Sequence, residues 1–401
     1  MTISQRWQAV MMPNYGTPPL ALDHGQGVRV WDVDGNSYLD FVGGIAVSSL
    51  GHAHPALVAA VTEQVGRLAH TSNLAIHEPG VRLAEKLVEL LDLPARVFFA
   101  NSGAEANECA LKLARLAGRA QGRAEIVSCH DSFHGRTFGA LSVTGNAAKR
   151  EPFAPLPGPV TFVDYGDAAA LRRAVGPRTA AVIVEPTLGE GGVIAPPAGF
   201  LAAARSICDD GGALLIVDEV QSGIGRTGSW FATQAEGVRP DVITLAKGLG
   251  GGLPIGACLG VGAAGELFAP GDHGSTFGGN PVSCAAALAV LATIADDGLL
   301  DNVKRVGEHL ARRLDALDSP LVAETRGSGL WRAVGLTGPH ASAVEAAARR
   351  RGLLVNAVKP TALRLAPPLV LTEAEVDEAA PMLAAALHEV AAATAEDGAD
   401  A

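Results

Sequence analysis

Short apolar runs separated by longer amphipathic segments make up the middle of the chain. The runs lack polar alternation, which is typical of strands buried on both faces of a sheet. The predicted strands are residues 97–100, 125–129, 160–163, 180–185, 213–218 and 242–246. One intervening segment places Phe200, Ala204 and Ile207 on a single helix face. Strands that alternate with helices predict an α/β domain with a mainly parallel, doubly wound sheet.

The two ends of the chain have a different pattern. Apolar positions alternate between residues 25 and 41 around a central Asp-Gly pair, which is typical of a β-hairpin. An apolar helix at 285–294 leads to a second set of segments, with strands predicted at 330–336, 353–355 and 363–365 and a last helix from about Glu373. This second set of segments predicts a separate α+β layer.

We therefore expect four parts. Residues 1–70 form an amino-terminal segment with the hairpin of a small lobe, 71–285 a large ligand-binding domain, and 286–390 a small carboxyl-terminal α+β domain. Residues 391–401 have little to bury, so we expect a flexible tail there.

The composition excludes several classes of function. The 401 residues carry a formal net charge of −11, which argues against nucleic acid or an anionic membrane surface as a partner. Five cysteines are scattered without paired spacing, as expected for free thiols in a reducing cytoplasm. No apolar run is long enough to cross a bilayer, and the amino terminus lacks the apolar core of a signal peptide. We expect a cytoplasmic protein that acts on small molecules.

Two polar residues end neighbouring apolar runs. Asp218 closes the run 213–218, and Lys247 follows the run 242–246 and precedes glycines that permit tight turns. In an open α/β sheet both lie at the carboxyl edge, where ligands bind. They suit pyridoxal 5'-phosphate, because the lysine amine bonds to its aldehyde and the carboxylate keeps its pyridine nitrogen protonated. Taken alone, Lys247 more readily fits a surface lysine.

A candidate phosphate site follows the run 97–100. The next residues read as a turn and a helix start, where the Ser102 hydroxyl and the free N–H groups of Gly103 and Ala104 would bind an anion. Ser102 as a simple N-cap fits this segment equally well. After the run 125–129 comes Phe133, an aromatic side chain suited to stack on a ring.

Six short motifs follow one another along the chain. They are Asn101-Ser-Gly-Ala-Glu-Ala-Asn107, Phe133-His-Gly-Arg-Thr137, Val184-Glu-Pro186, Asp218-Glu-Val-Gln221, Lys247-Gly248 and Ser275-Thr-Phe-Gly-Gly-Asn-Pro281. In order and spacing they resemble class III pyridoxal-phosphate aminotransferases, over residues 14–368. Three further segments are similar to the acetylornithine branch of that class: Met12-Pro-Asn-Tyr-Gly-Thr-Pro-Pro-Leu20, Gly44-Ile-Ala-Val47 and His70-Thr-Ser-Asn73.

The resemblance implies a fold, a reaction and an assembly. The fold is type I, with the cofactor in the large domain. The reaction moves the δ-amino group of N2-acetyl-L-ornithine to 2-oxoglutarate in arginine biosynthesis, giving N-acetylglutamate 5-semialdehyde and L-glutamate. Lys247 is the catalytic residue, the general base and acid. The assembly is a homodimer with shared active sites.

The resemblance also assigns the other site residues. Arg136 would bind the donor's carboxylate, while Arg364 would bind the α-carboxylate of 2-oxoglutarate once Glu190 has moved off it. Ser275 and Thr276 would reach in from a partner subunit, and no metal site is assigned. The cofactor contacts are Ser102, Gly103, Ala104, Phe133, Glu185, Asp218, Gln221, Lys247 and Thr276. The substrate contacts are Arg136, Glu190, Ser275, Arg364 and Tyr15.

Three alternatives stay open. Ornithine, succinylornithine or succinyldiaminopimelate, and 4-aminobutyrate aminotransferases share this catalytic set and differ in the acyl pocket, for which Tyr15 is a candidate. Gly223-Ile-Gly-Arg-Thr-Gly228 matches the Gly-x-Gly-x-x-Gly pattern of an NAD-dependent dehydrogenase, but the acidic pair before it would repel a pyrophosphate. A non-catalytic interaction protein of the same fold would have lost Lys247 or Asp218, and both are present.

Overall fold

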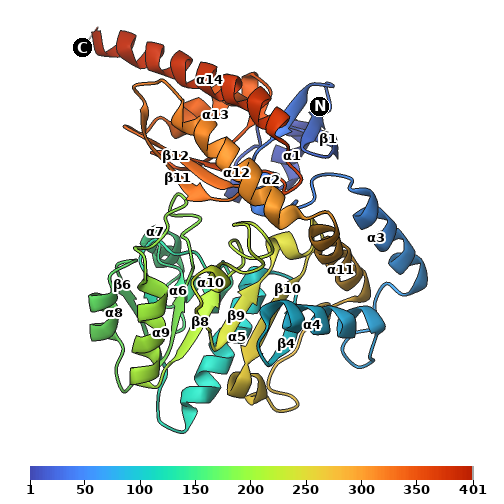
Figure 1. Ribbon diagram of the computed structural model, residues 1–401, viewed down its shortest axis with the longest axis vertical. Helices are drawn as coiled ribbons and strands as arrows, with labels where there is room; N and C mark the ends of the chain where they lie inside the picture. Colours follow the sequence, from blue (N-terminus) through green and yellow to red (C-terminus); the bar gives the residue numbers. More distant parts are fainter. Residues whose placement is uncertain (400–401) are drawn as a thin grey trace.

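The computed structural model describes residues 1–399, and a seven-stranded sheet forms its larger lobe (Figure 1). The strand order is β4-β10-β9-β8-β7-β5-β6. These strands are β4 (Ala95–Ala100), β5 (Glu125–Cys129), β6 (Val160–Val163), β7 (Thr179–Val184), β8 (Leu214–Asp218), β9 (Val242–Leu245) and β10 (Gly256–Val261). Neighbours from β9 to β6 are parallel, whereas β10 is antiparallel to both β4 and β9. The expected mainly parallel sheet is confirmed.

The sequence pattern did not predict β10. Two glycines interrupt its apolar residues, and the first, Gly256, is needed because an added Cβ would lie 2.3 Å from the carbonyl oxygen of Ser102. The backbone of β10 therefore packs against the turn between β4 and α5 (Gly103–Arg119).

Helices cover both faces of this sheet. In β7 and β8, Val182, Val184 and Leu215 pack toward α8 (Ala168–Ala174) and α9 (Phe200–Gly211). The alternate residues Ile183 and Ile216 pack toward α5 and α6 (Phe138–Val143) on the other face. Because successive strand residues point to opposite faces, both faces of these strands are apolar, which explains their unbroken hydrophobic runs.

The smaller lobe is built from both ends of the chain. Its first sheet has the order β1-β2-β3-β13, and its second has the order β11-β12-β15-β14. The strands are β1 (Leu22–Gln26), β2 (Arg29–Asp32), β3 (Ser37–Asp40), β11 (Val322–Ser328), β12 (Trp331–Leu336), β13 (Leu353–Leu354), β14 (Asn356–Lys359) and β15 (Ala362–Leu365). The expected strand at 353–355 thus joins the amino-terminal hairpin, where it pairs in parallel with β3, and not the second sheet.

The remaining helices connect and cover these sheets. In Figure 1, α12, α13 and α14 lie over the small lobe, while α3, α4 and α11 lie beside the large one. They are α1 (Ile3–Val10), α2 (Gly43–Ala46), α3 (Pro55–Arg67), α4 (Glu78–Leu91), α7 (Ala147–Arg150), α10 (Ala232–Ala235), α11 (Pro281–Asp296), α12 (Leu299–Asp315), α13 (Ala341–Arg350) and α14 (Glu373–Ala399). Four short 3₁₀ helices are Pro13–Tyr15, Glu151–Phe153, Lys247–Leu249 and Gly262–Glu266.

Helix α14 continues to Ala399 through alanine-rich residues, which favour helix strongly. The flexible tail expected at 391–401 stays a prediction, and residues 400 and 401 lie outside the described part. The domain boundaries stay a prediction. Among residues 1–399 no single helix is long and apolar enough to cross a membrane, whereas α11 and α12 together, bent by 69°, reach that length and composition.

Candidate active site

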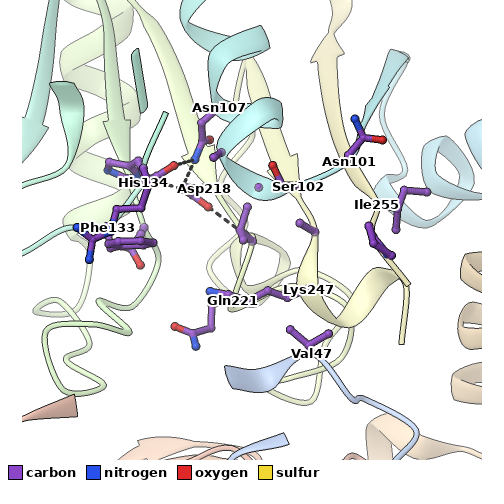
Figure 2. Close-up of a pocket in the computed structure, with 18 of the residues that line it drawn as sticks. Val47, Asn101, Ser102, Asn107, Phe133, His134, Asp218, Gln221, Lys247 and Ile255 are labelled. Atoms are coloured by element: carbon purple, nitrogen blue, oxygen red, sulfur yellow. Dashed lines mark hydrogen bonds and ion pairs between the residues drawn. The ribbon is translucent and has the colours of Figure 1, made fainter. Parts of the chain in front are cut away.

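A cavity of about 370 Å³ opens at the carboxyl ends of β7, β8 and β9 (Figure 2). Both residues singled out from the sequence, Asp218 and Lys247, line it. Val47, from the amino-terminal segment, lines the side below Lys247. The cavity is therefore closed by a segment that lies far from the sheet in the sequence.

Asp218 is buried at the end of β8 and is held by a polar network (Figure 2). Its Oδ2 accepts a hydrogen bond of 2.7 Å from Nδ2 of Asn107 and lies 2.8 Å from Nδ1 of His134. The hydroxyl of Thr244 on β9 donates to Oδ1 of Asn107 at 2.8 Å, which fixes the orientation of the amide. The network aims one carboxylate into the cavity.

The sequence did not single out Asn107, His134 or Thr244. The first two stand inside quoted motifs, but neither motif indicates that their side chains converge on the end of another strand. Their contacts depend on the packing of α5 across the sheet, which a one-dimensional pattern does not contain.

Lys247 follows β9 and has a φ of +44°, in the left-handed region that non-glycine residues rarely adopt. Backbone strain of this kind concentrates at functional sites. The pKa of Lys247 is lowered, first because burial penalises the ammonium and second because the Arg364 guanidinium is near. Nearby carboxylates act in the opposite sense. A lysine with a lowered pKa is suited to act as a nucleophile and a general base.

The turn before α5, the candidate phosphate site, lies at one end of the cavity. The Ser102 side chain caps the helix by accepting from the N–H of Glu105 at 3.2 Å, so the N-cap reading is right. Gly103 and Ala104 precede that bonded N–H and line the cavity, and the first N–H groups of a helix have no partner within it. N–H groups left free at a capped helix start are suited to bind an anion.

Glu185 follows β7 and Gln221 lies in the turn after β8, and both line the cavity. Burial raises the pKa of the Glu185 carboxyl to about 7, with His134 acting against this and Asp218 adding to it. Its Oε1 accepts from the backbone N–H of Phe133 at 2.8 Å, which fixes the aromatic residue's backbone. Gln221 passes close to Gly189, where any Cβ would lie 1.7 Å from its Oε1.

Glu190 and Arg364 form a partly buried ion pair between the lobes. Arg364 on β15 is 2 % exposed, and its Nη1 donates to Oε1 of Glu190 at 2.8 Å. Its Nη2 donates to Oδ1 of Asn356 at 2.7 Å. Arg364 lowers the pKa of Glu190, although burial alone would raise it. The two residues meet as expected, with the arginine covered by the carboxylate.

Arg136 lies at the border of two hollows. It lines the central cavity and also an outer hollow of about 390 Å³, and its guanidinium lies 5.6 Å from the centre of the Phe133 ring. Tyr15 is 83 % exposed and lines the outer hollow only. The residues of the outer hollow are Asn14, Tyr15, Arg136, Phe138, Leu141 and Phe153.

Ser275 and Thr276 do not line the cavity of their own chain. Thr276 is exposed, and Ser275 is held at the edge of the site by the Asn101 amide, which donates to its Oγ at 3.3 Å. The following residue, Phe277, is 60 % exposed. Within one chain, this segment therefore lies beside the cavity and does not line it.

Residues 10–387 match the family model for class-III aminotransferases, and the chain belongs to that family. Its enzymes depend on pyridoxal phosphate and have the type I fold, so the expected class, fold and cofactor are confirmed. The dinucleotide-binding alternative is excluded with them: residues 223–228 form turns after β8 and do not begin a helix.

Within the family the chain is similar to enzymes named acetylornithine aminotransferase. It is 60% identical over 378 residues to that of Mycobacterium tuberculosis, covering 94% of each chain, and 55% identical over 397 residues to that of Streptomyces coelicolor, covering 99% and 98%. The ornithine aminotransferase structure from Toxoplasma gondii has a TM-score of 0.92 at 34% identity, covering 96% of this chain and 93% of that one. The acetylornithine aminotransferase from Elizabethkingia anophelis has 0.85 at 33%, covering 96% and 98%. Overall shape therefore does not separate the two substrate classes.

The residues present fit pyridoxal phosphate. Gly103 and Ala104 offer N–H groups for its phosphate, Asp218 a fixed carboxylate for its ring nitrogen, and Lys247 an amine for its aldehyde. Nε2 of Gln221 is buried and has no partner among the described residues, so a polar ligand atom would satisfy it. When bound, the cofactor supplies an aldehyde carbon that takes up an amino group and a ring that accepts the electron pair left on the substrate carbon.

Proposed function

We propose that the chain transfers the δ-amino group of N2-acetyl-L-ornithine to 2-oxoglutarate, giving N-acetylglutamate 5-semialdehyde and L-glutamate in arginine biosynthesis. The identity of 60% to a relative of that name supports the substrate. The Glu190–Arg364 pair carries the argument from structure, because a movable carboxylate over a buried arginine lets one site serve two substrates.

The two substrates make different demands on the site. The donor presents its δ-amine near Lys247 and its carboxylate and acyl group at a distance, where Arg136 and the outer hollow with Tyr15 provide a cation and room. 2-Oxoglutarate presents an α-carboxylate close to its reacting carbon, so it needs a second cation near Lys247. In this proposal Arg364 supplies that cation after Glu190 moves away.

Lys247 is the proton carrier of the proposed reaction. Its Nζ would remove the proton from the substrate carbon that bears the amine and deliver it to the carbon that takes up the amino group. Burial and the Arg364 charge lower its pKa, which favours the neutral amine that can accept a proton. Phe133 and Gln221 border the cofactor's ring, and the Ser102 turn holds its phosphate.

The proposal includes a homodimer with shared sites. Leu74 and Ile76 are 97 % and 92 % exposed, and the Phe277 ring lies 5.0 Å from that of His70 on the same exposed surface. A partner chain covering these side chains would bury them and receive Thr276 at its phosphate site and Ser275 near its substrate. All five cysteines are free and buried, which fits the proposed cytoplasmic location.

The test is a half-reaction without oxo acid. The purified holoenzyme is mixed separately with N-acetylornithine, ornithine, N-succinyl-diaminopimelate and 4-aminobutyrate, and the loss of the absorbance of its resting form is followed in a stopped-flow instrument. Fastest conversion with N-acetylornithine is expected. Faster conversion with another amine would replace the substrate and keep the mechanism.

A further inference from the structure

Glu190 has two cationic partners, and only one of them is explained by the proposed function. Its Oε1 lies 2.8 Å from Nη1 of Arg364, while its Oε2 lies 3.6 Å from Nζ of Lys149. Lys149 is on the short helix α7, in a different part of the large lobe from the strand end that supports the Glu190 loop. The carboxylate is thus shared between two elements.

The backbone around Glu190 is fixed. Leu188 and Ile194 exchange backbone hydrogen bonds of 2.8 and 3.0 Å, and Arg326 donates to the Gly192 carbonyl at 2.9 Å. Arg364 is fixed as well, because it is buried and bonded to Asn356. Freeing Arg364 therefore requires rotation of the Glu190 side chain, which moves its carboxylate by only a few ångströms.

Lys149 lies close enough for the rotated Glu190 carboxylate to contact it. Its side chain is 27% exposed, and its Nζ lies 5.0 Å above the centre of the Phe133 ring. Burial lowers the pKa of Lys149, whereas Glu190 acts to raise it, as expected for a carboxylate 3.6 Å from the ammonium. A carboxylate that rotates away from Arg364 toward α7 keeps a counterion.

We propose that Lys149 is a positioning residue that receives Glu190 when Glu190 leaves Arg364, and so sets how readily the site accepts the oxo acid. The inference rests on the proposed function, because it needs Arg364 to bind the α-carboxylate of 2-oxoglutarate. Without Lys149 the carboxylate has only Arg364 as a partner, and it competes more strongly with the incoming oxo acid.

The main experiment measures binding as well as turnover. For Lys149→Met we expect the KM for 2-oxoglutarate and the dissociation constant of glutarate, measured by calorimetry on the holoenzyme, to rise about fivefold, a size typical of a partly exposed ion pair. The limiting rate of the acceptor half-reaction changes less than KM. Lys149→Arg restores both constants. Lys304→Met is the matched control, since Lys304 forms an exposed pair with Asp301 at the same 3.6 Å separation, on α12.

A double-mutant cycle separates this role from direct contact with the ligand. In a Glu190→Gln background there is no carboxylate to receive, so adding Lys149→Met should leave glutarate binding within about twofold. Equal weakening in both backgrounds would show that Lys149 contacts the ligand itself, and an unchanged single variant would show that it does nothing; either result overturns the proposal.

Glutarate binding does not depend on which amine the enzyme uses. A wild-type enzyme that converts another donor faster than N-acetylornithine removes the proposed function and leaves this test intact. If the dissociation constant of glutarate is the same in Lys149→Met and wild type, this inference is wrong and the proposed function is unaffected.

Discussion

Replacing Asn107 with alanine should destabilise the protein before any chemistry is considered. The side chain is 1 % exposed and makes three hydrogen bonds: two donated, to Asp218 and to the His134 carbonyl, and one accepted from Thr244. A buried hydrogen bond to a charged group contributes about 2 kcal/mol and each neutral one about 1 kcal/mol, so we expect the free energy of unfolding to fall by about 4 kcal/mol.

The matched comparison is Thr244→Val, which keeps the shape of the side chain and removes only its hydroxyl. It deletes one neutral hydrogen bond, so the expected loss is about 1 kcal/mol. Urea unfolding of both cofactor-free variants measures the two losses. Cofactor affinity, titrated by absorbance, should fall more for Asn107→Ala, because Asp218 then loses a donor that aims it. Equal losses of stability in the two variants would refute the view that Asn107 is the centre of this network.

Three further outcomes follow from the site. Lys247→Ala should abolish turnover and leave circular dichroism and thermal unfolding close to wild type; full activity would remove the catalytic assignment. Glu190→Ala should let ordinary α-amino acids act as donors, measured as half-reaction rates, and an unchanged donor preference would contradict the covering role of Glu190. Glu185 has a folded-state pKa of about 7 against an ordinary 4.5, so the folded protein binds more protons than the unfolded chain between these values. The free energy of unfolding of the cofactor-free protein should therefore fall as pH rises from 4.5 to 7 and then level off. In Glu185→Gln the free energy of unfolding should change little between pH 4.5 and 7. If the variant shows the same fall as wild type, other groups cause the pH dependence.

The elements best predicted from the sequence are those whose pattern reflects burial on two faces. The strands ending in Asp218 and near Lys247 were placed to within a residue, because a short, continuous apolar run bounded by polar residues and glycines is typical of a strand covered on both sides. Strand β10 escaped detection because it depends on backbone contact at Gly256. Helix α12 was not predicted for a different reason. It follows another helix, α11, whereas α9 lies between two strands whose patterns mark its ends.

The residues of the candidate site also fall into two groups, those that the sequence predicted and those that it did not. Residues inside one motif, such as the Ser102 turn, were assigned from local physics, whereas the Asp218 network required knowing which helix crosses which strand. The role of Lys149 had no signal in the sequence at all: a lysine in a polar segment reads as a solvated residue. The role depends on the contact between Lys149 and Glu190, which are 41 positions apart in the sequence.

The pairing of β13 with β3 has a consequence for the way the protein is made. The strand at Ser37–Asp40 finishes its sheet only with Leu353–Leu354, so the amino-terminal lobe remains incomplete until nearly the whole chain has left the ribosome. Pairings between such distant segments form slowly, because the chain entropy of closing the loop is lost before the contact is gained. The seven-stranded sheet, whose strands lie between residues 95 and 261, has all its segments available earlier. Because Val47 follows β3 in the chain and lines the cavity, we expect the catalytic pocket to be completed after the seven-stranded sheet.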